Sequence, residues 1–302
     1  MQPCGQGYEK EAINLYRRGD SGGFTVSRAE TFRRTGRLGN VRRRWAPIRQ
    51  KLGLLKSRTP GSEFERLREF LGRPEEQRLL GQVRGSESVC WPRSADSPEP
   101  LVTVRIATYR RSDLIKRALD SVLSQSYQKL EVMVIGDACD DATQKAVESY
   151  SDMRLRFINL PTRGLYPEDA KSRWMVAGTH PMNAALPLIS GDWIAPCDDD
   201  DEFTPNHVEA LLERAISGRY EMVWSRAMLR QPDGNWVKTE GPPMALNRIS
   251  HGSVLYSSGL RFFQHSNTSW RMKEPGDWNL WRRMQKAGVR IGFLDEVTYY
   301  HY

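Results

Sequence analysis

The sequence has few cysteines and no long apolar run. Its four cysteines, Cys4, Cys90, Cys139 and Cys197, lie far apart and form no Cys-x-x-Cys pair, which argues against a disulfide framework and a zinc site. No apolar run approaches the roughly 18 residues of a membrane span, and the opening residues lack the basic-then-apolar order of a signal peptide. We therefore expect a cytoplasmic protein with reduced thiols, without export and without a membrane-spanning segment.

The composition is that of a folded chain, and its positive charge is concentrated in one part. Apolar residues make up 39% and charged residues 27% of the 302 residues, which permits a hydrophobic core and argues against global disorder. Residues 1–100 contain 20 Lys and Arg against 12 Asp and Glu, whereas residues 101–302 contain 25 of each. The net charge of +8 therefore lies in the first third, which indicates that the two parts of the chain meet different surroundings.

This basic first third is predicted to be a region of its own. Residues 1–85 have helical periodicity in several short stretches, and residues 86–100 are rich in Ser and Pro, as linkers are. The arginine run at 42–44 suits either a solvated helix face or contact with a polyanion. We expect peripheral contact with an anionic membrane, at its inner face, through residues 1–60. We do not expect nucleic acid as a partner, and the balanced charges of residues 101–302 confine that alternative to the first third.

The remaining two thirds of the chain alternate short apolar strands with amphipathic helices. Strands are predicted at 101–106, 130–135, 154–158 and 193–196, with helices between and after them. This alternation indicates an α/β domain over 101–302, with a mainly parallel sheet and helices on both faces. Ligands of such sheets bind beyond the carboxyl ends of the strands, so functional residues are expected at these ends.

Polar residues follow the first two of these strands. Thr108 and Tyr109 come after the first, in a turn that by itself carries little information. Asp137 comes directly after the second, where a carboxylate can accept hydrogen bonds from a nucleobase or a ribose. The neighbouring Asp140 or Asp141 is expected to cap the helix that follows.

A run of consecutive acidic residues, Asp198 to Glu202, follows the strand at 193–196. If the chain stays extended there, Asp198 and Asp200 lie on one side. Clustered carboxylates repel one another, and a hard divalent cation such as Mg²⁺ or Mn²⁺ would remove this cost. A solvated acidic loop ahead of a helix at Pro205 is the alternative. The position of the run directly after a strand favours the metal site.

Two further polar residues stand near the end of the sequence. Asp277 precedes the helical stretch 278–284, and the ordinary role of a single aspartate at that position is a helix cap. His301 lies on a predicted strand at 297–301, where a single histidine is ordinarily a structural or surface residue. Neither residue would be assigned a function on its own.

Taken together and in this order, four segments resemble family 2 glycosyltransferases of the GT-A fold. The segment VTVRIATYRR resembles the family's first strand and its Thr-Tyr turn, and EVMVIGDACDDAT resembles its segment VIVVDDGSTDDT. The acidic segment GDWIAPCDDDDEF resembles its Asp-x-Asp metal site, and GDWNLWRRMQKAG resembles the segment that carries the catalytic base. The resemblance covers about residues 101–302, in which no QxxRW-type segment of processive synthases occurs.

The resemblance implies an inverting glycosyltransferase that moves a sugar from a nucleotide-diphosphate donor to an acceptor hydroxyl, in glycan or cell-surface polysaccharide biosynthesis. It implies Mn²⁺ or Mg²⁺ as cofactor, and a glycan, a lipid-linked sugar or a small molecule as acceptor. It also implies roles for individual residues of this chain. The catalytic base is Asp277, the metal ligands are Asp200, Asp198 and His301, and the donor contacts are Thr108, Tyr109, Asp137, Asn183, Asp198 and Asp199.

Three departures from the family pattern leave an alternative open. Gly136 stands in place of the first aspartate of the DDGSTD segment, Met182 in place of an arginine, and Gly276 in place of a glutamate. A glycosyltransferase-like binding or scaffold protein with impaired catalysis would account for them, although the aspartates assigned above are retained. A sugar-phosphate nucleotidyltransferase would want a glycine-rich phosphate loop after the first strand, and this sequence has no glycine there.

Overall fold

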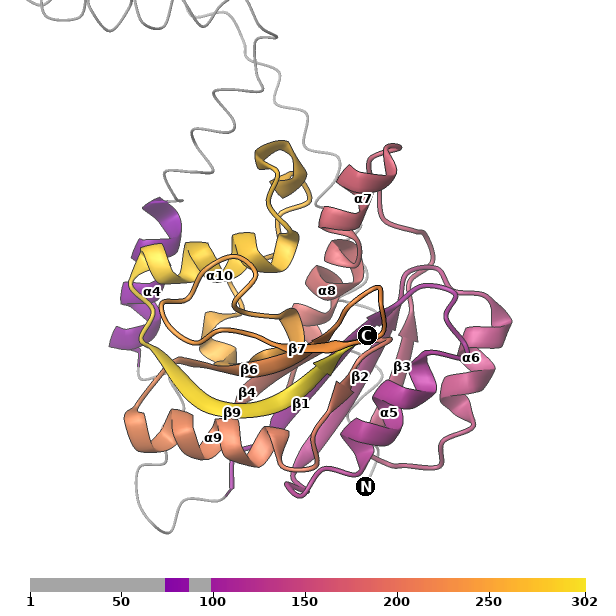
Figure 1. Cartoon of the computed structure of the whole chain (residues 1–302), viewed down its shortest axis with the longest axis horizontal. Helices are drawn as coiled ribbons and strands as arrows, with labels where there is room; N and C mark the ends of the chain where they lie inside the picture. The colour runs from indigo at the N-terminus through magenta and orange to yellow at the C-terminus, as the bar shows by residue number, and fades with distance from the viewer. Residues whose placement is uncertain (1–73, 87–98) are drawn as a thin grey trace, which may run out of the picture. The chain divides into compact units, whose positions relative to one another are not determined.

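The computed structural model describes residues 74–86 and 99–302, and all of them belong to one compact unit (Figure 1). The predictions for residues 1–73 and for linker residues 87–98 lie outside the described residues. The division of the chain at residues 85 and 100 therefore stays a prediction. No helix in the described part of the chain is long and apolar enough to cross a membrane.

A nine-stranded mixed sheet forms the centre of this unit, in the order β3-β2-β1-β4-β8-β6-β9-β5 with β7 paired to β6. Neighbouring strands from β3 to β4 are parallel, as are β6 and β9, whereas β5, β7 and β8 run antiparallel to their neighbours. The predicted α/β fold is confirmed. The half of the sheet from β8 to β5 contains both parallel and antiparallel neighbours. The strands are β1 (Val102–Thr108), β2 (Leu130–Gly136), β3 (Leu155–Asn159), β4 (Trp193–Asp198), β5 (Glu202–Phe203), β6 (Met222–Arg230), β7 (Trp236–Lys238), β8 (Val254–Ser257) and β9 (Ile291–His301).

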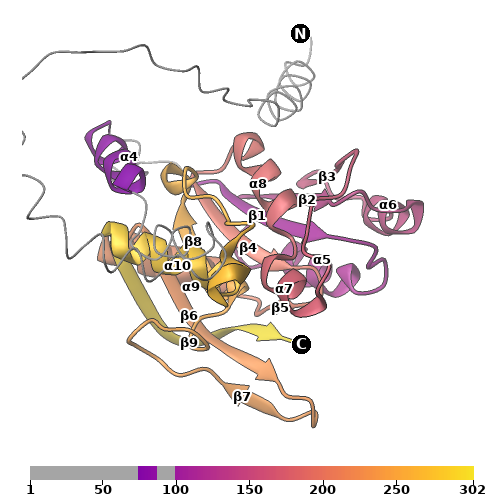
Figure 2. The same ribbon diagram turned by 90° about the horizontal axis from the view of Figure 1, so that it is seen from above.

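Helices cover both faces of the sheet (Figures 1 and 2). Three helices, α5, α6 and α9, pack on one face, and α4, α8 and α10 pack on the other. The helices are α4 (Pro74–Gly85), α5 (Ile115–Leu123), α6 (Asp141–Glu148), α7 (Ala170–Val176), α8 (Thr179–Ala185), α9 (His207–Gly218) and α10 (Gly276–Ala287).

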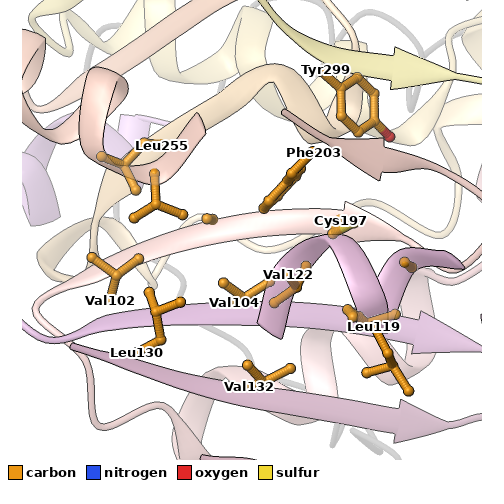
Figure 3. Packing of buried hydrophobic residues seen from close by; sticks show 14 of the residues in the cluster. Val102, Val104, Leu119, Val122, Leu130, Val132, Cys197, Phe203, Leu255 and Tyr299 are labelled. Carbon is orange, nitrogen blue, oxygen red and sulfur yellow. The ribbon is translucent and has the colours of Figure 1, made fainter. Parts of the chain in front are cut away.

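The core follows from the alternation of side chains along the central strands. Val102, Val104 and Ile106 of β1 point to the face that α5, α6 and α9 cover, and all three are fully buried. Figure 3 shows this cluster, in which Tyr299 of β9 takes part with its ring while its hydroxyl lies at the edge. Arg105 lies between two of these positions and points to the opposite face, because side chains of a strand alternate.

Local signals account for most helix ends. Asp140 caps α6 by accepting a hydrogen bond from the backbone N–H of Thr143 at 3.1 Å, as predicted. Gly288 ends α10 with φ of 91°, a conformation that favours glycine. Helix α4 begins at Pro74, within the region 1–85 that the sequence predicted to be helical in short stretches. Proline suits the first position of a helix, because the N–H that it lacks has no partner there.

Candidate active site

The predicted site residues of three strands lie side by side at one edge of the sheet. In the parallel register, Thr108 at the end of β1 stands opposite Gly136 at the end of β2. On the other side of β1, Ala107 stands opposite Asp198 at the end of β4. The ends of β1, β2 and β4 therefore bring the Thr108–Tyr109 turn, Asp137 and the acidic run to the same edge.

The acidic run does not stay extended, and this changes which aspartates meet. The chain turns after Asp198, and the backbone N–H of Asp201 donates to the carbonyl of Asp198 at 3.3 Å. Ligand atoms of Asp198, Asp201 and His301 lie within 4.8 Å of one another. The prediction that Asp198 and Asp200 share one side assumed an extended chain, and this condition is not met, because the turn brings together residues three apart. Two of the three predicted metal ligands thus lie in a carboxylate–histidine cluster whose third member is Asp201.

Strong hydrogen bonds hold this cluster. The carboxylate of Asp201 accepts from His301 Nδ1 at 2.7 Å, from the backbone N–H of Tyr302 at 2.9 Å and from the hydroxyl of Tyr299. The hydrogen bond between His301 and Asp201 raises the pKa of His301 to about 9, although partial burial opposes this shift. Asp198 accepts from His251 Nδ1 at 2.9 Å. Burial opposes the ionised form of Asp198, but the nearby histidines outweigh it and lower its pKa.

The other two aspartates of the run are bridged by an arginine. Nη1 of Arg111 donates to Asp199 at 2.9 Å and to Asp200 at 2.6 Å. Burial raises the pKa of Asp199 to about 6, although the charge of Arg111 opposes this shift. The pKa of Asp200 is raised for the same reason. Asp200, the predicted principal ligand, is therefore ion-paired and lies outside the carboxylate–histidine cluster.

The carboxylate–histidine cluster has the chemistry of a divalent metal site. Two carboxylates and one imidazole are ligands that Mn²⁺ accepts, whereas Mg²⁺ prefers an all-oxygen shell. Imidazole binds a metal in its neutral form, so a cation at this site would displace one ring proton of His301. The residues present therefore fit a divalent cation, with Asp201 in the place predicted for Asp200.

The predicted donor residues at the ends of β1 and β2 form a second part of the site. The buried carboxylate of Asp137 accepts from the backbone N–H of Gly164 at 2.8 Å and from the hydroxyl of Tyr166 at 2.6 Å. The guanidinium of Arg163 lies 3.9 Å from the centre of the Tyr109 ring. Asp137 thus holds the loop that follows β3 over the Thr108–Tyr109 turn.

Asn183 has a structural role that the sequence did not indicate. Its side-chain amide donates to the carbonyl of His265 at 2.9 Å, and its Oδ1 accepts from the backbone N–H of His265 at 2.8 Å. Both ends of the amide are therefore engaged by one backbone segment. The predicted contact of Asn183 with the nucleotide stays a prediction that these hydrogen bonds do not support.

Asp277 lies in the first turn of α10. The N-cap of this helix is Pro275, so Asp277 is not the cap that the sequence makes its ordinary role. Burial raises the pKa of its carboxyl, and the charge of His251 opposes the shift. His251 is the residue that bonds Asp198, so Asp277 and the carboxylate–histidine cluster share a neighbour.

Two of the three departures from the family pattern, Gly136 and Gly276, have close neighbours that account for the absence of a side chain; the structure offers no such explanation for Met182. A Cβ at Gly136 would lie 2.6 Å from Oδ1 of Asn159, whose amide also bonds both backbone groups of Cys139. A Cβ at Gly276 would lie 3.2 Å from the carbonyl oxygen of residue 175, at the end of α7. The carbonyl of Met182 accepts from Nη1 of Arg105 at 2.9 Å.

Known proteins resemble this chain in sequence and in fold. The profile described as Glycosyl transferase family 2 matches residues 103–167 and 180–283, which is more than half of the chain. The chain belongs to this family. The succinoglycan biosynthesis protein ExoO of Rhizobium meliloti (strain 1021) is 35% identical over 170 residues, which cover 54% of this chain and 45% of ExoO. The hyaluronan synthase of Pasteurella multocida is 25% identical over 211 residues, which cover 66% of this chain and 20% of the synthase.

Solved structures support the fold of this family 2 chain. TarS of S. aureus, residues 1–349 in complex with UDP, superposes with a TM-score of 0.51 at 19% identity, over 66% of this chain and 60% of TarS. The complex of the same protein with UDP-GlcNAc gives a TM-score of 0.50 at 19% identity, over 66% and 58%. The predicted GT-A fold is thereby confirmed. The chain spans less than half the length of ExoO and of the hyaluronan synthase.

Several site residues were missed by the sequence analysis. Asp201 belongs to the acidic run, and its position three residues after Asp198 fits a turn. Arg111 follows the first strand closely and could have been weighed as a partner for the acids. His251 and Arg105 gave no local signal, since each reaches the site only through the order of strands in the sheet.

Proposed function

We propose that this family 2 chain is an inverting, metal-dependent glycosyltransferase that moves a sugar from a nucleotide-diphosphate donor to an acceptor hydroxyl in glycan or polysaccharide biosynthesis. The observation that carries the proposal is the place of His251. Its ring bonds Asp198 of the carboxylate–histidine cluster, and its charge acts on Asp277. The candidate metal ligand Asp198 and the candidate base Asp277 therefore share His251 as a neighbour.

The donor class follows from the two parts of the site and from the relatives. The Thr108–Tyr109 turn, Asp137 and Asp199 offer an aromatic ring and buried polar groups at the strand ends, where a nucleotide would bind. TarS has been solved with UDP and with UDP-GlcNAc. ExoO is named for succinoglycan biosynthesis and the Pasteurella protein for hyaluronan synthesis. These names support a nucleotide sugar as donor and a saccharide product.

The carboxylate–histidine cluster would hold the cation through Asp198, Asp201 and His301. A divalent cation bound there supplies positive charge that offsets the charge developing on the leaving diphosphate. Hydrogen bonds from Tyr299 and from the backbone of Tyr302 keep Asp201 in place for this task. The single positive charge of Arg111 offsets part of the charge of the neighbouring pair Asp199 and Asp200, so the run does not repel the anionic donor with its full charge.

Asp277 is the proposed base. The acceptor hydroxyl must lose a proton as it attacks the anomeric carbon, and an ionised carboxylate can take that proton. Burial raises the pKa of Asp277, whereas the charge of His251 and the positive N-terminal end of the α10 dipole favour its ionised form. Attack from the face opposite the leaving diphosphate inverts the anomeric carbon without a covalent intermediate, as in inverting glycosidases.

The alternative is a chain that binds nucleotide sugars without turning them over. The departures at 136, 182 and 276 motivate it. The close neighbours of Gly136 and Gly276 account for glycine at these two positions: Asn159 beside Gly136, and the end of α7 beside Gly276. Retention of Asp137, Asp198 and Asp277 supports turnover over binding alone.

The replacement Asp277→Asn separates these functions. We expect turnover to fall by about 10²- to 10⁴-fold, because an amide cannot accept the proton, while donor affinity is unchanged. The measurement is hydrolysis of UDP-glucose, UDP-N-acetylglucosamine and GDP-mannose with Mn²⁺, together with calorimetry of donor binding. Asp141→Asn is the matched control, since Asp141 also lies in the first turn of a helix and is exposed.

Two results would contradict the proposal. Turnover of Asp277→Asn near that of the wild type would show that the base lies elsewhere. Donor binding by the wild type without turnover of any donor, with or without Mn²⁺, would favour the impaired binding protein.

A further inference from the structure

Arg105 is a buried arginine in the middle of the first strand, three residues before Thr108. Its exposed fraction is 0%, and no carboxylate in the described residues forms an ion pair with it. The guanidinium group of arginine is a cation in proteins. A buried charge without a counter-charge is costly, so hydrogen bonds must hold this side chain.

Two hydrogen bonds from its guanidinium are present. Nη1 donates to the carbonyl of Met182 on α8 at 2.9 Å, and Nη2 lies 3.3 Å from Nε2 of His265. A guanidinium has no acceptor atom, so Nε2 of His265 must be the acceptor and its proton must reside on Nδ1. Burial, and then the charge of Arg105, lower the pKa of His265 well below its usual value, which keeps the ring neutral.

The second ring nitrogen of His265 reaches the start of α10. Its N–H donates to the backbone carbonyl of Gly276. Gly276 directly precedes Asp277. The backbone of His265 is itself fixed by both ends of the Asn183 amide. A line of hydrogen bonds therefore runs from β1 through Arg105 and His265 to the peptide before Asp277.

We propose that Arg105 is a positioning residue for Asp277 and acts through His265. The guanidinium selects the tautomer of His265 that can donate to Gly276, and this bond sets the entry of the chain into α10 and with it the direction of the Asp277 carboxylate. Arg105 itself touches no substrate. The proposal rests on the proposed function of Asp277 as the base. Misplacement of a reacting group by about 1 Å can lower a rate by about 10²-fold, so such a residue matters for turnover.

The test is a double-mutant cycle of Arg105→Met and His265→Phe in the full chain. We expect each single variant to lower kcat by about 10- to 100-fold while the donor KM changes less than twofold. We expect the double variant to be no slower than the slower single variant, because both changes break the same line of bonds. Arg105→Lys keeps the charge and can make one of the two bonds, so we expect it to recover part of kcat.

The matched control is Thr103→Val. Thr103 lies on the same strand and the same face, is fully buried and bonds Glu131 and the backbone N–H of Gly191, away from His265. We expect this variant to melt earlier with kcat unchanged. Multiplying effects in the double variant, a donor KM that rises as kcat falls, or an equal loss of kcat in Thr103→Val would overturn the proposal.

A second cycle separates this proposal from the proposed function. In the Asp277→Asn background, Arg105→Met should cause no further loss of kcat. A further loss of 10-fold or more would mean that Arg105 acts on another group, and the positioning role would be refuted while Asp277 remained the base. Normal turnover of Asp277→Asn alone would refute the base, and the role of Arg105 with it.

Discussion

A buried ion pair anchors helix α4 to the rest of the unit. The free energy of unfolding that is lost when this pair is broken can be calculated. Glu76 of α4 is 5% exposed and pairs with Arg283 of α10, which is 1% exposed. Arg283 also donates to Oδ1 of Asn279 at 3.0 Å and to the carbonyl of Gln264. The replacement Glu76→Gln removes the carboxylate and so breaks this ion pair to a buried guanidinium.

Two costs determine how much the free energy of unfolding falls: that of breaking the ion pair and that of detaching α4. Breaking a buried ion pair from one side costs about 3–5 kcal/mol. The protein can reduce this cost if α4 detaches and lets water reach Arg283, but detachment exposes Leu80, which is 2% exposed and contributes about 2 kcal/mol through its burial. We therefore expect Glu76→Gln to lower the free energy of unfolding by about 3 kcal/mol.

Urea unfolding followed by tryptophan fluorescence measures this change. With a denaturant slope of about 2–3 kcal/mol per molar, the midpoint should fall by about 1 M. The control is Glu75→Gln, because Glu75 is the neighbouring glutamate, is 73% exposed and pairs only with Arg78 on the surface. We expect its midpoint within the error of the wild type, since exposed pairs contribute little. Equal midpoints for the two variants would refute the reasoning that α4 is anchored by Glu76.

Three further outcomes are expected. A chain that begins at Gly72 should unfold in urea at the midpoint of the full chain. One that begins at Pro98 lacks α4 and should be less stable by about 5 kcal/mol, because it loses the ion pair of Glu76 and the burial of Leu80 together. Calorimetry should show a large loss of Mn²⁺ affinity in Asp201→Asn and little loss in Asp200→Asn, because only Asp201 lies in the carboxylate–histidine cluster. Burial opposes the ionised form of Glu221, but its hydrogen bonds to Arg84 and to the backbone of Arg290 outweigh it and lower the pKa. The stability difference between the wild type and Glu221→Gln should therefore be full at pH 7, begin to shrink as the pH falls below the ordinary glutamate pKa of about 4.3, and be lost as the pH falls through the lowered pKa. Urea midpoints measured across pH test this, and a difference that stays constant with pH would contradict it.

The sequence by itself determined the parts of this protein that depend on neighbouring residues. The apolar runs of β1 and β2, the cap at Asp140 and the end of α10 at Gly288 are local, because a strand, a cap or a left-handed turn is decided within a few residues. The order of four short segments was enough to indicate the family. The acidic run after β4 was likewise visible as a candidate metal site.

Tertiary structure decided which of these residues work together. The sequence could not show that Asp201 replaces Asp200 beside Asp198, since this depends on a turn and on the pairing of β9 with β5, which brings His301 to that turn. The partnership of Arg105 with His265 joins residues 160 positions apart across the sheet. No periodicity encodes such contacts, because they depend on strand order and helix packing, in which every element takes part at once.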